Sequence, residues 1–127
     1  MKEVFATPQF TTLCSLESIA RNVGSVTLAA EASLGENVVE VEMVGSNVRW
    51  HQAGMALSFA LSALESLTMV PVPHNGERFI ALVLTFKSGE EALRYRMITS
   101  HVAEAAWLRE SADRLGRLLS LPVALEG

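Results

Sequence analysis

The chain contains very few of the residues from which catalytic sites are commonly built. Cys14 is the only cysteine and Asp113 is the only aspartate. A single cysteine cannot form an internal disulfide, so a reducing compartment is the better fit. A single aspartate excludes aspartate dyads and most carboxylate-based calcium loops and catalytic triads. We expect Cys14 to be an ordinary buried thiol and Asp113 to lie on the exposed face of a helix.

Metal-binding and phosphate-binding motifs are also missing. The three histidines, His51, His74 and His101, lack the spacing that metal ligands show on a helix. No glycine-rich segment joins a strand to a helix, as a phosphate-binding loop requires. His51 with Glu40 is the one pair that resembles an active-site arrangement, and no nucleophile or orienting group completes it. The sequence therefore predicts no enzyme, no metal and no cofactor.

Positive charge is scarce. Lys2 and Lys87 are the only lysines, the arginines are scattered along the chain, and the formal net charge is −4. A surface that binds nucleic acid needs a cluster of basic residues. We therefore expect no nucleic-acid partner.

Long hydrophobic runs are absent. The longest uncharged stretches, residues 4–16 and 50–64, fall short of the ~20 residues that a membrane-spanning helix needs. The first residues, Lys2 and Glu3 followed by a polar segment with Pro8, make a poor signal peptide. We expect no membrane span and a cytoplasmic location.

Apolar residues, in contrast, are abundant. They make up 50% of the chain, while charged residues make up 19%. This composition excludes a disordered chain, and the length of 127 residues suits a single domain over residues 1–127. So many apolar residues also indicate that a partner, an identical subunit or a ligand covers part of the surface.

A hairpin over residues 78–99 is expected at the centre of the fold. Residues 79–86 form an unbroken apolar and β-branched run, which is typical of a strand buried on both faces. After the turn at Gly89, apolar residues alternate with Arg94 and Arg96. This alternation predicts a return strand with one solvated face.

The first half of the chain predicts further strands and a short helix. Residues 4–5 are a strand candidate, and residues 13–23 have the apolar spacing of a helix with Thr12 as its N-cap. Residues 25–32 and 38–44 alternate as strands do, with a turn at 34–37 between them.

The register of the next hairpin follows from its turn. A two-residue turn at Gly45-Ser46 places Glu42 opposite Arg49, Glu40 opposite His51, Met43 opposite Val48 and Val41 opposite Trp50. A turn at Ser46-Asn47 would shift one strand by a residue and place Glu42 opposite His51. Pairs of opposite charge and of apolar side chains favour the first register.

Residues 55–70 fit two different structures. With a period of two, a turn at Ala53-Gly54 places Trp50 opposite Leu57 and continues the apolar face of a sheet. With a period of 3.6, apolar side chains from Leu57 to Leu67 form one helical stripe. The pattern supports both, and the helix propensity of Ala and Leu slightly favours the helix.

The clearest helix covers about residues 100–120. Ser100 is a suitable N-cap, Pro122 prevents continuation, and Gly116 would permit close packing. Beside the core-facing residues, a second stripe consists of Trp107, Arg114 and Leu118. Since Trp and Arg are typical anchors of protein interfaces, we predict that Trp107, Arg114 and Leu118 bind a partner.

The order of these segments resembles the bacterial pleckstrin-homology-like domains. The resemblance is one of pattern and covers about residues 39–122, including the run 61–71, the strand 81–89 and the helix that leads from Ser100 to Pro122. It implies an α+β fold in which an antiparallel curled sheet or open barrel is packed by a long C-terminal helix, and it implies a binding scaffold. The alternative from the residues alone is a two-layer sandwich of two hairpin-plus-helix units, residues 37–68 and 78–120.

Two functions are compatible with this reading. The first is a non-enzymatic interaction module that binds a protein partner, or a second copy of itself, through the C-terminal helix and the adjoining sheet edge. The second is a carrier of a small apolar ligand inside the curled sheet. Its pocket would be lined by Trp50, Phe59, Phe86 and Tyr95.

Overall fold

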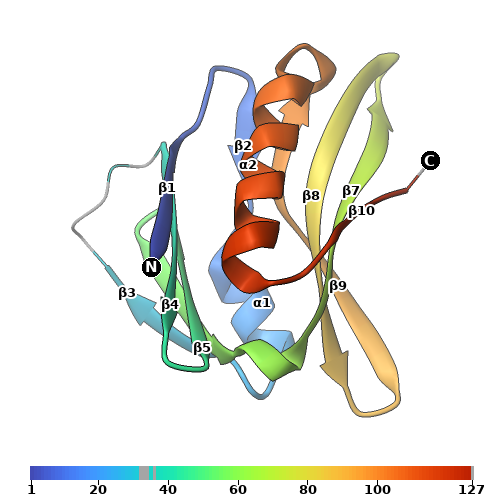
Figure 1. Ribbon diagram of the computed structural model, residues 1–127. Coiled ribbons are helices and arrows are strands. Elements are labelled where there is room, and N and C mark those ends of the chain that lie inside the picture. The colour runs from blue at the N-terminus through green and yellow to red at the C-terminus, as the bar shows by residue number, and fades with distance from the viewer. Residues whose placement is uncertain (32–34, 36, 127) are drawn as a thin grey trace.

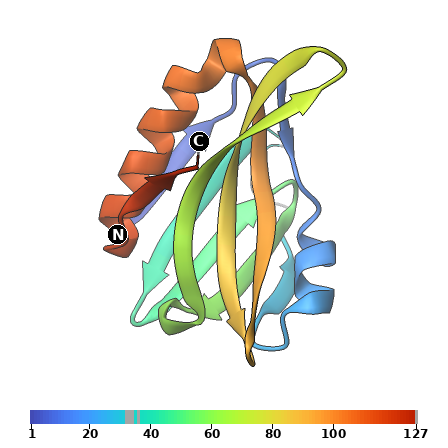
Figure 2. The ribbon, with the colours of Figure 1, turned by 90° about the vertical axis from the view of Figure 1, so that its right-hand side faces the viewer.

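Two five-stranded sheets face each other across one core in the computed structural model, which describes residues 1–31, 35 and 37–126 (Figures 1 and 2). The helices are α1 (Leu16–Asn22) and α2 (Ala105–Leu119), with short 3-10 turns η1 (Leu61–Ala63) and η2 (Val102–Glu104). The strands are β1 (Lys2–Ala6), β2 (Thr11–Leu13), β3 (Thr27–Ala30), β4 (Val38–Val44), β5 (Asn47–Gln52), β6 (Met55–Ala60), β7 (Leu64–His74), β8 (Glu77–Ser88), β9 (Glu91–His101) and β10 (Val123–Leu125).

Sheet A is antiparallel and has the strand order β1-β4-β5-β6-β3. The predicted register of its first hairpin is confirmed, because Glu42 lies opposite Arg49 and Val41 lies opposite Trp50. Gly45 has a φ of +62°, the left-handed conformation that a two-residue turn with Gly at its first central position requires. The predicted strand 25–32 is shorter in the structure, and part of the predicted turn at 34–37 lies outside the described residues.

Sheet B has the order β10-β7-β8-β9-β2, with β10 parallel to β7 and the other pairs antiparallel. The predicted central hairpin is confirmed as β8 and β9, and residues 81–86 are buried on both faces. The register shifts by one residue where Leu82 pairs with Ile98 and Val83 with Arg96, so Met97 forms a bulge.

The core lies between the sheets, and the two helices close its open sides. Figure 2 shows α2 along one side of the sandwich and α1 along the other. The buried face of α2 includes Leu108, Leu115 and Leu119, which join Trp50 and Phe86 in one hydrophobic core. Helix α2 contacts β1 of sheet A and both β7 and β10 of sheet B. It therefore holds the two sheets together.

The slight preference for a helix at residues 55–70 was wrong, and with it the alternative of two hairpin-plus-helix units. Residues 55–60 and 64–74 are strands, separated only by η1. Leu57 pairs with Trp50 and Phe59 pairs with Val48, and both side chains are buried in the core. Cross-strand pairing and burial outweigh the local helix propensity, which is a weak preference of a few tenths of a kcal/mol for each residue.

Both predicted helices begin later than expected. Leu13 belongs to β2 and pairs with Ile98, so α1 starts at Leu16 with Ser15, not Thr12, as its N-cap. Ser100 is not the N-cap of α2, because it is a fully buried residue of β9 whose hydroxyl bonds to that of Thr11 at 3.0 Å. Pairing with β2 thus extends β9 into the residues that were predicted to start the helix.

The fold is α+β, with mostly antiparallel sheets and a C-terminal helix. Each sheet has two edge strands in the described part of the chain, so no barrel closes. Within the same residues, neither helix has the length and hydrophobicity needed to span a bilayer.

Candidate functional site

Three connections meet at one end of the sandwich, the upper end in Figures 1 and 2. They are the β1–β2 connection with Phe10, the β7–β8 turn and the η2 segment with Val102. Apolar side chains gather here, and we call them the apolar tip. Its members are Phe10, Pro71, Pro73, Phe79 and Val102.

Phe79 lies at the centre of the apolar tip. Its ring makes edge-on contacts with His74, at 6.3 Å between ring centroids, and with His101, at 5.4 Å. One cavity of about 340 Å³ lies between Phe79, His101 and Phe10, and a second of about 380 Å³ lies between Phe79, Pro71 and Val102. Cavities of this size, with mostly apolar walls, suit an apolar side chain or a small ligand.

Phe10 is both strained and exposed. Its φ of +66° lies in the left-handed region, which costs a non-glycine residue about 1–2 kcal/mol. Burial of the phenyl side chain does not offset this cost, since the residue is 69% exposed. Val102, at 47% exposed, extends the same apolar surface. Strained backbone conformations cluster at functional sites, and the strain at Phe10 is not accompanied by burial of its side chain. Phe10 is therefore a candidate contact residue.

The predicted partner residues of α2 lie along the flank that faces β1. Arg114 forms an ion pair with Glu3, and its guanidinium lies 4.7 Å from the centroid of the Phe5 ring. Trp107 and Leu118 are half-buried and pack against the core. Arg114 therefore has a structural role in holding β1, while partner binding by this stripe stays a prediction.

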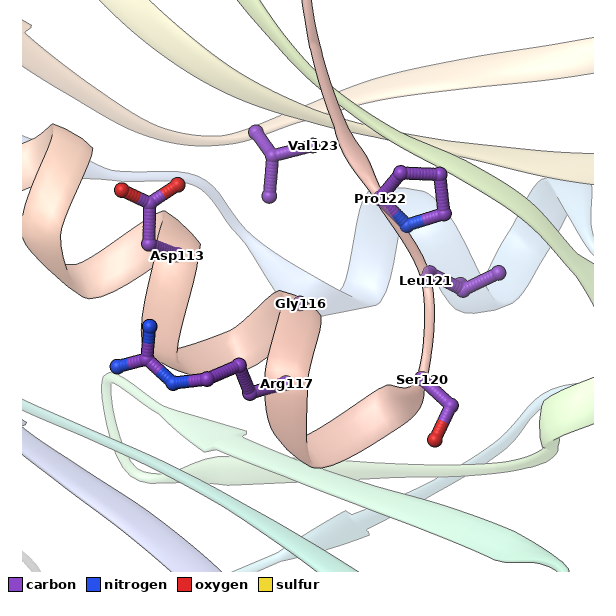
Figure 3. A pocket seen from close by; sticks show the side chains of 7 residues that line it. All are labelled: Asp113, Gly116, Arg117, Ser120, Leu121, Pro122 and Val123. Atoms are coloured by element: carbon purple, nitrogen blue, oxygen red, sulfur yellow. The ribbon is translucent and has the colours of Figure 1, made fainter.

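The other flank of α2 borders a shallow groove of about 280 Å³ (Figure 3). Asp113 and Arg117 lie on the helix side, and Pro122 and Val123 lie on the side of the chain that leads into β10. Gly116 lies between them, and a Cβ atom there would be 2.7 Å from the Leu121 carbonyl oxygen. The predicted close packing at Gly116 is thus present.

The residues proposed to line a ligand pocket are packed against one another. Trp50, Phe59 and Phe86 are all at most 2% exposed. The rings of Phe59 and Phe86 meet edge to face at 4.9 Å, and Tyr95 follows at 6.2 Å from Phe86. Their side chains fill the space between the sheets, as core residues do.

Gln52 is a buried polar residue that links the two sheets. Its amide oxygen accepts a hydrogen bond from the Trp50 indole at 2.8 Å, and its amide nitrogen donates to the carbonyl oxygens of Cys14 and Met97, each at 3.1 Å. Burial raises the pKa of the neighbouring Cys14 thiol to about 11, so this thiol stays protonated at neutral pH.

The His51–Glu40 pair does not form the arrangement of a catalytic dyad. The two residues lie opposite each other, but the Glu40 carboxylate forms an ion pair with Lys2 at 3.2 Å. His51 is 3% exposed, and its Nε2 atom has no hydrogen-bond partner among the described residues. The same part of the chain contains no group of three or more His, Cys, Asp or Glu side chains arranged to hold a metal ion.

His51 should make the protein less stable in mild acid. Burial, and then the charge of Arg49, lower the pKa of His51 below 6.5, so the folded protein protonates His51 less readily than the unfolded chain does. The unfolded chain takes up a proton near pH 6.5, and stability is therefore lost as pH falls from 6.5 toward the folded-state pKa. Urea unfolding at several pH values should show a smaller decrease for His51→Gln. The exposed and non-titrating Gln9→Leu control should keep the wild-type pH dependence, and equal slopes for all three proteins would contradict this account.

The apolar tip was missed by sequence reasoning. Phe10, Phe79 and His101 are far apart in the sequence, and only the β2–β9 and β8–β9 pairings bring them together. The one local signal is Pro71 and Pro73 at the end of a strand, since proline within a strand indicates an edge.

No family model, no curated protein and no solved structure matches this chain.

Proposed function

We propose that the chain is a non-enzymatic module that binds a protein partner, or a second copy of itself, through the apolar tip. The exposed Phe10 at a strained φ is the observation that carries the proposal. Exposed apolar side chains next to Phe79 offer an anchor site of the kind that supplies most of the energy in protein interfaces. Exposed apolar patches of this kind mark interaction sites in soluble proteins.

The edge of β7 restricts how a partner would bind. Among the described residues, β10 covers β7 only at residues 67–69, and β7 continues to His74. Beyond the part that β10 covers, Pro71 and Pro73 have no backbone N–H to donate. A partner strand added at this edge would lack those hydrogen bonds. The proposed partner therefore docks with side chains and does not extend the sheet.

The relation to pleckstrin-homology-like domains is a further proposal. It is supported by the order of three consecutive strands in sheet A, three in sheet B and a helix that lies across the open side. In such a scaffold the connections at the ends of the strands are free to bind, which agrees with a site at the apolar tip.

The proposal is tested by paired substitutions at exposed apolar residues. Phe10→Asn should preserve stability, because Asn tolerates a positive φ, and Val102→Ser removes a second exposed side chain. Val44→Ser is the matched control, since Val44 is 54% exposed at the end of β4 in sheet A. Quantitative capture from cell extract, together with the solution mass from light scattering, compares the four proteins.

We expect the wild type and Val44→Ser to retain the same bound protein or the same self-association. Phe10→Asn and Val102→Ser should weaken it about tenfold or more, as the loss of an interface anchor does. Equal binding by all four folded proteins would contradict a docking site at the apolar tip. Loss of binding with Val44→Ser alone would place the interface on sheet A.

A further inference from the structure

The outer face of sheet B contains a cavity that has walls of two kinds. It measures about 340 Å³, and one wall is formed by the cross-strand pair Val72 and Phe79. The opposite wall is polar and is formed by the cross-strand pair Thr12 and Thr99, together with Arg96. His74 also lines the cavity. Four neighbouring strands, β2, β7, β8 and β9, each contribute to it.

Arg96 gives this cavity an unbalanced positive charge. Arg94, two residues away on the same face, forms an ion pair with Glu126 at 3.0 Å. Arg96 makes no ion pair among the described residues, and no carboxylate lines the cavity. The chain as a whole has a net charge of −4, so the charge of this cavity is opposite in sign to the net charge of the chain.

The hydrogen-bonding groups of the cavity favour an anion. A guanidinium donates in a planar fork that matches a carboxylate, and threonine hydroxyls donate to the same kind of acceptor. The aromatic ring of Phe79 and the side chain of Val72 would remain uncovered by a small inorganic anion. A ligand that fits both walls carries its anionic group on an apolar body.

A second cavity continues this site along the sheet. It measures about 200 Å³ and lies between Arg96, Arg94, Val70 and Val83. Its lining also combines guanidinium groups with apolar side chains. The apolar body of a ligand therefore has room to extend past Arg96.

We infer that the outer face of sheet B binds an organic carboxylate, held at its charged end by Arg96 and along its apolar body by Phe79 and Val72. Two sources supply this chemistry. One is a free organic acid, and the other is an acidic side chain that follows an apolar one in a protein segment. Phe79 belongs to both this cavity and the apolar tip, but Phe10 and Val102 do not line the cavity, so substitutions at those two residues test protein docking separately.

The first experiment uses phenylacetate as the probe and its uncharged isostere phenylacetamide as the control. Two-dimensional amide NMR spectra of the full chain follow the signals of Thr12, Thr99 and Arg96. We expect saturable shifts with phenylacetate and an affinity for phenylacetamide that is lower by about tenfold, the effect of losing one charge-assisted hydrogen bond. Inorganic phosphate tests whether charge alone is sufficient.

Two arginine variants make the matched comparison. Arg96→Gln should lower the affinity for phenylacetate by about tenfold. Arg94→Gln removes a guanidinium that already has Glu126 as its partner, so it should change the affinity much less. Both side chains are exposed, and the dispersion of the same spectra reports whether each variant is folded.

The protein source is tested with the N-acetylated dipeptide amides Phe-Asp and Phe-Asn. Binding of phenylacetate that depends on Arg96 supports the site and a free organic acid. Binding of Phe-Asp alone, with the same dependence, supports the site and a protein segment. The inference is overturned if Arg96→Gln binds as the wild type does, if acid and amide bind equally, if phosphate reproduces the shifts, or if neither acid nor peptide binds.

Discussion

Replacing Gln52 with leucine is expected to lower the free energy of unfolding by about 3 kcal/mol, because the buried Trp50 indole N–H and the part-buried Cys14 carbonyl oxygen would lose their partners. The Trp50 indole N–H donates only to the Gln52 side chain among the described residues, and the Cys14 carbonyl oxygen accepts from its amide nitrogen. The Met97 carbonyl oxygen would keep its hydrogen bond from the Cys14 backbone N–H. The similar volume of leucine separates this loss from that of a cavity.

Gln9→Leu is the matched control for this experiment. Gln9 is exposed, so the same chemical change should stay within about 0.5 kcal/mol of the wild type. Both variants are compared by urea unfolding followed through the fluorescence of Trp50 and Trp107. A Gln52→Leu protein as stable as the wild type would mean that the polar link between the sheets adds nothing to stability.

Gly116→Ala is expected to destabilise the protein by about 2 kcal/mol, although alanine is the better helix former. Helix propensity alone would give a gain of up to about 1 kcal/mol. The new Cβ atom would lie 2.7 Å from the Leu121 carbonyl oxygen and 3.0 Å from Val123 Cγ2. A backbone carbonyl cannot move aside as a flexible side chain can, so the segment that leads into β10 must be displaced. The sign of the change therefore decides between packing and propensity.

Hydrogen exchange locates the effect of Gly116→Ala. The Glu126 amide donates to the Met69 carbonyl oxygen at 2.9 Å and should lose protection if β10 is displaced. Gly24→Ala is the control, because a Cβ atom there meets nothing within 4 Å and its φ is not positive. A Gly116→Ala protein more stable than the wild type, with the Glu126 amide still protected, would show that the Leu121 carbonyl group can shift to admit the Cβ atom at little cost.

The first hairpin of sheet A could be predicted because its signals are local. The turn at Gly45 and the alternation of the two adjacent strands are sufficient to place Trp50 opposite Val41. Residues 55–70, which include Leu57, could not be separated from a helix, because their structure depends on pairing with β5 and β8 and on burial. Local pattern thus identifies a hairpin but not the structure of a segment that also has helical spacing.

The candidate site depends on contacts between distant residues, which no local pattern reveals. Phe10 joins Phe79 and His101 only after the edge strand β2 pairs with β9. Arg96 was predicted on the solvated face of its strand, and this holds. Its cavity, however, is formed with Thr12 and Val72, which come from other strands. Sequence reasoning could therefore identify single side chains but not the surfaces that they form together.

The pairing of β2 with β9 has a consequence for how this protein is made. Thr11 and Ser100, which share a hydrogen bond, are 89 positions apart. During synthesis β2 leaves the ribosome long before β9, so the backbone groups of β2, including those of Leu13, stay unpaired until β9 has been made. Folds that depend on such distant pairs form slowly and expose apolar segments meanwhile. We therefore expect the unpaired segment of the nascent chain to be accessible to chaperones until residues 98–100 have emerged.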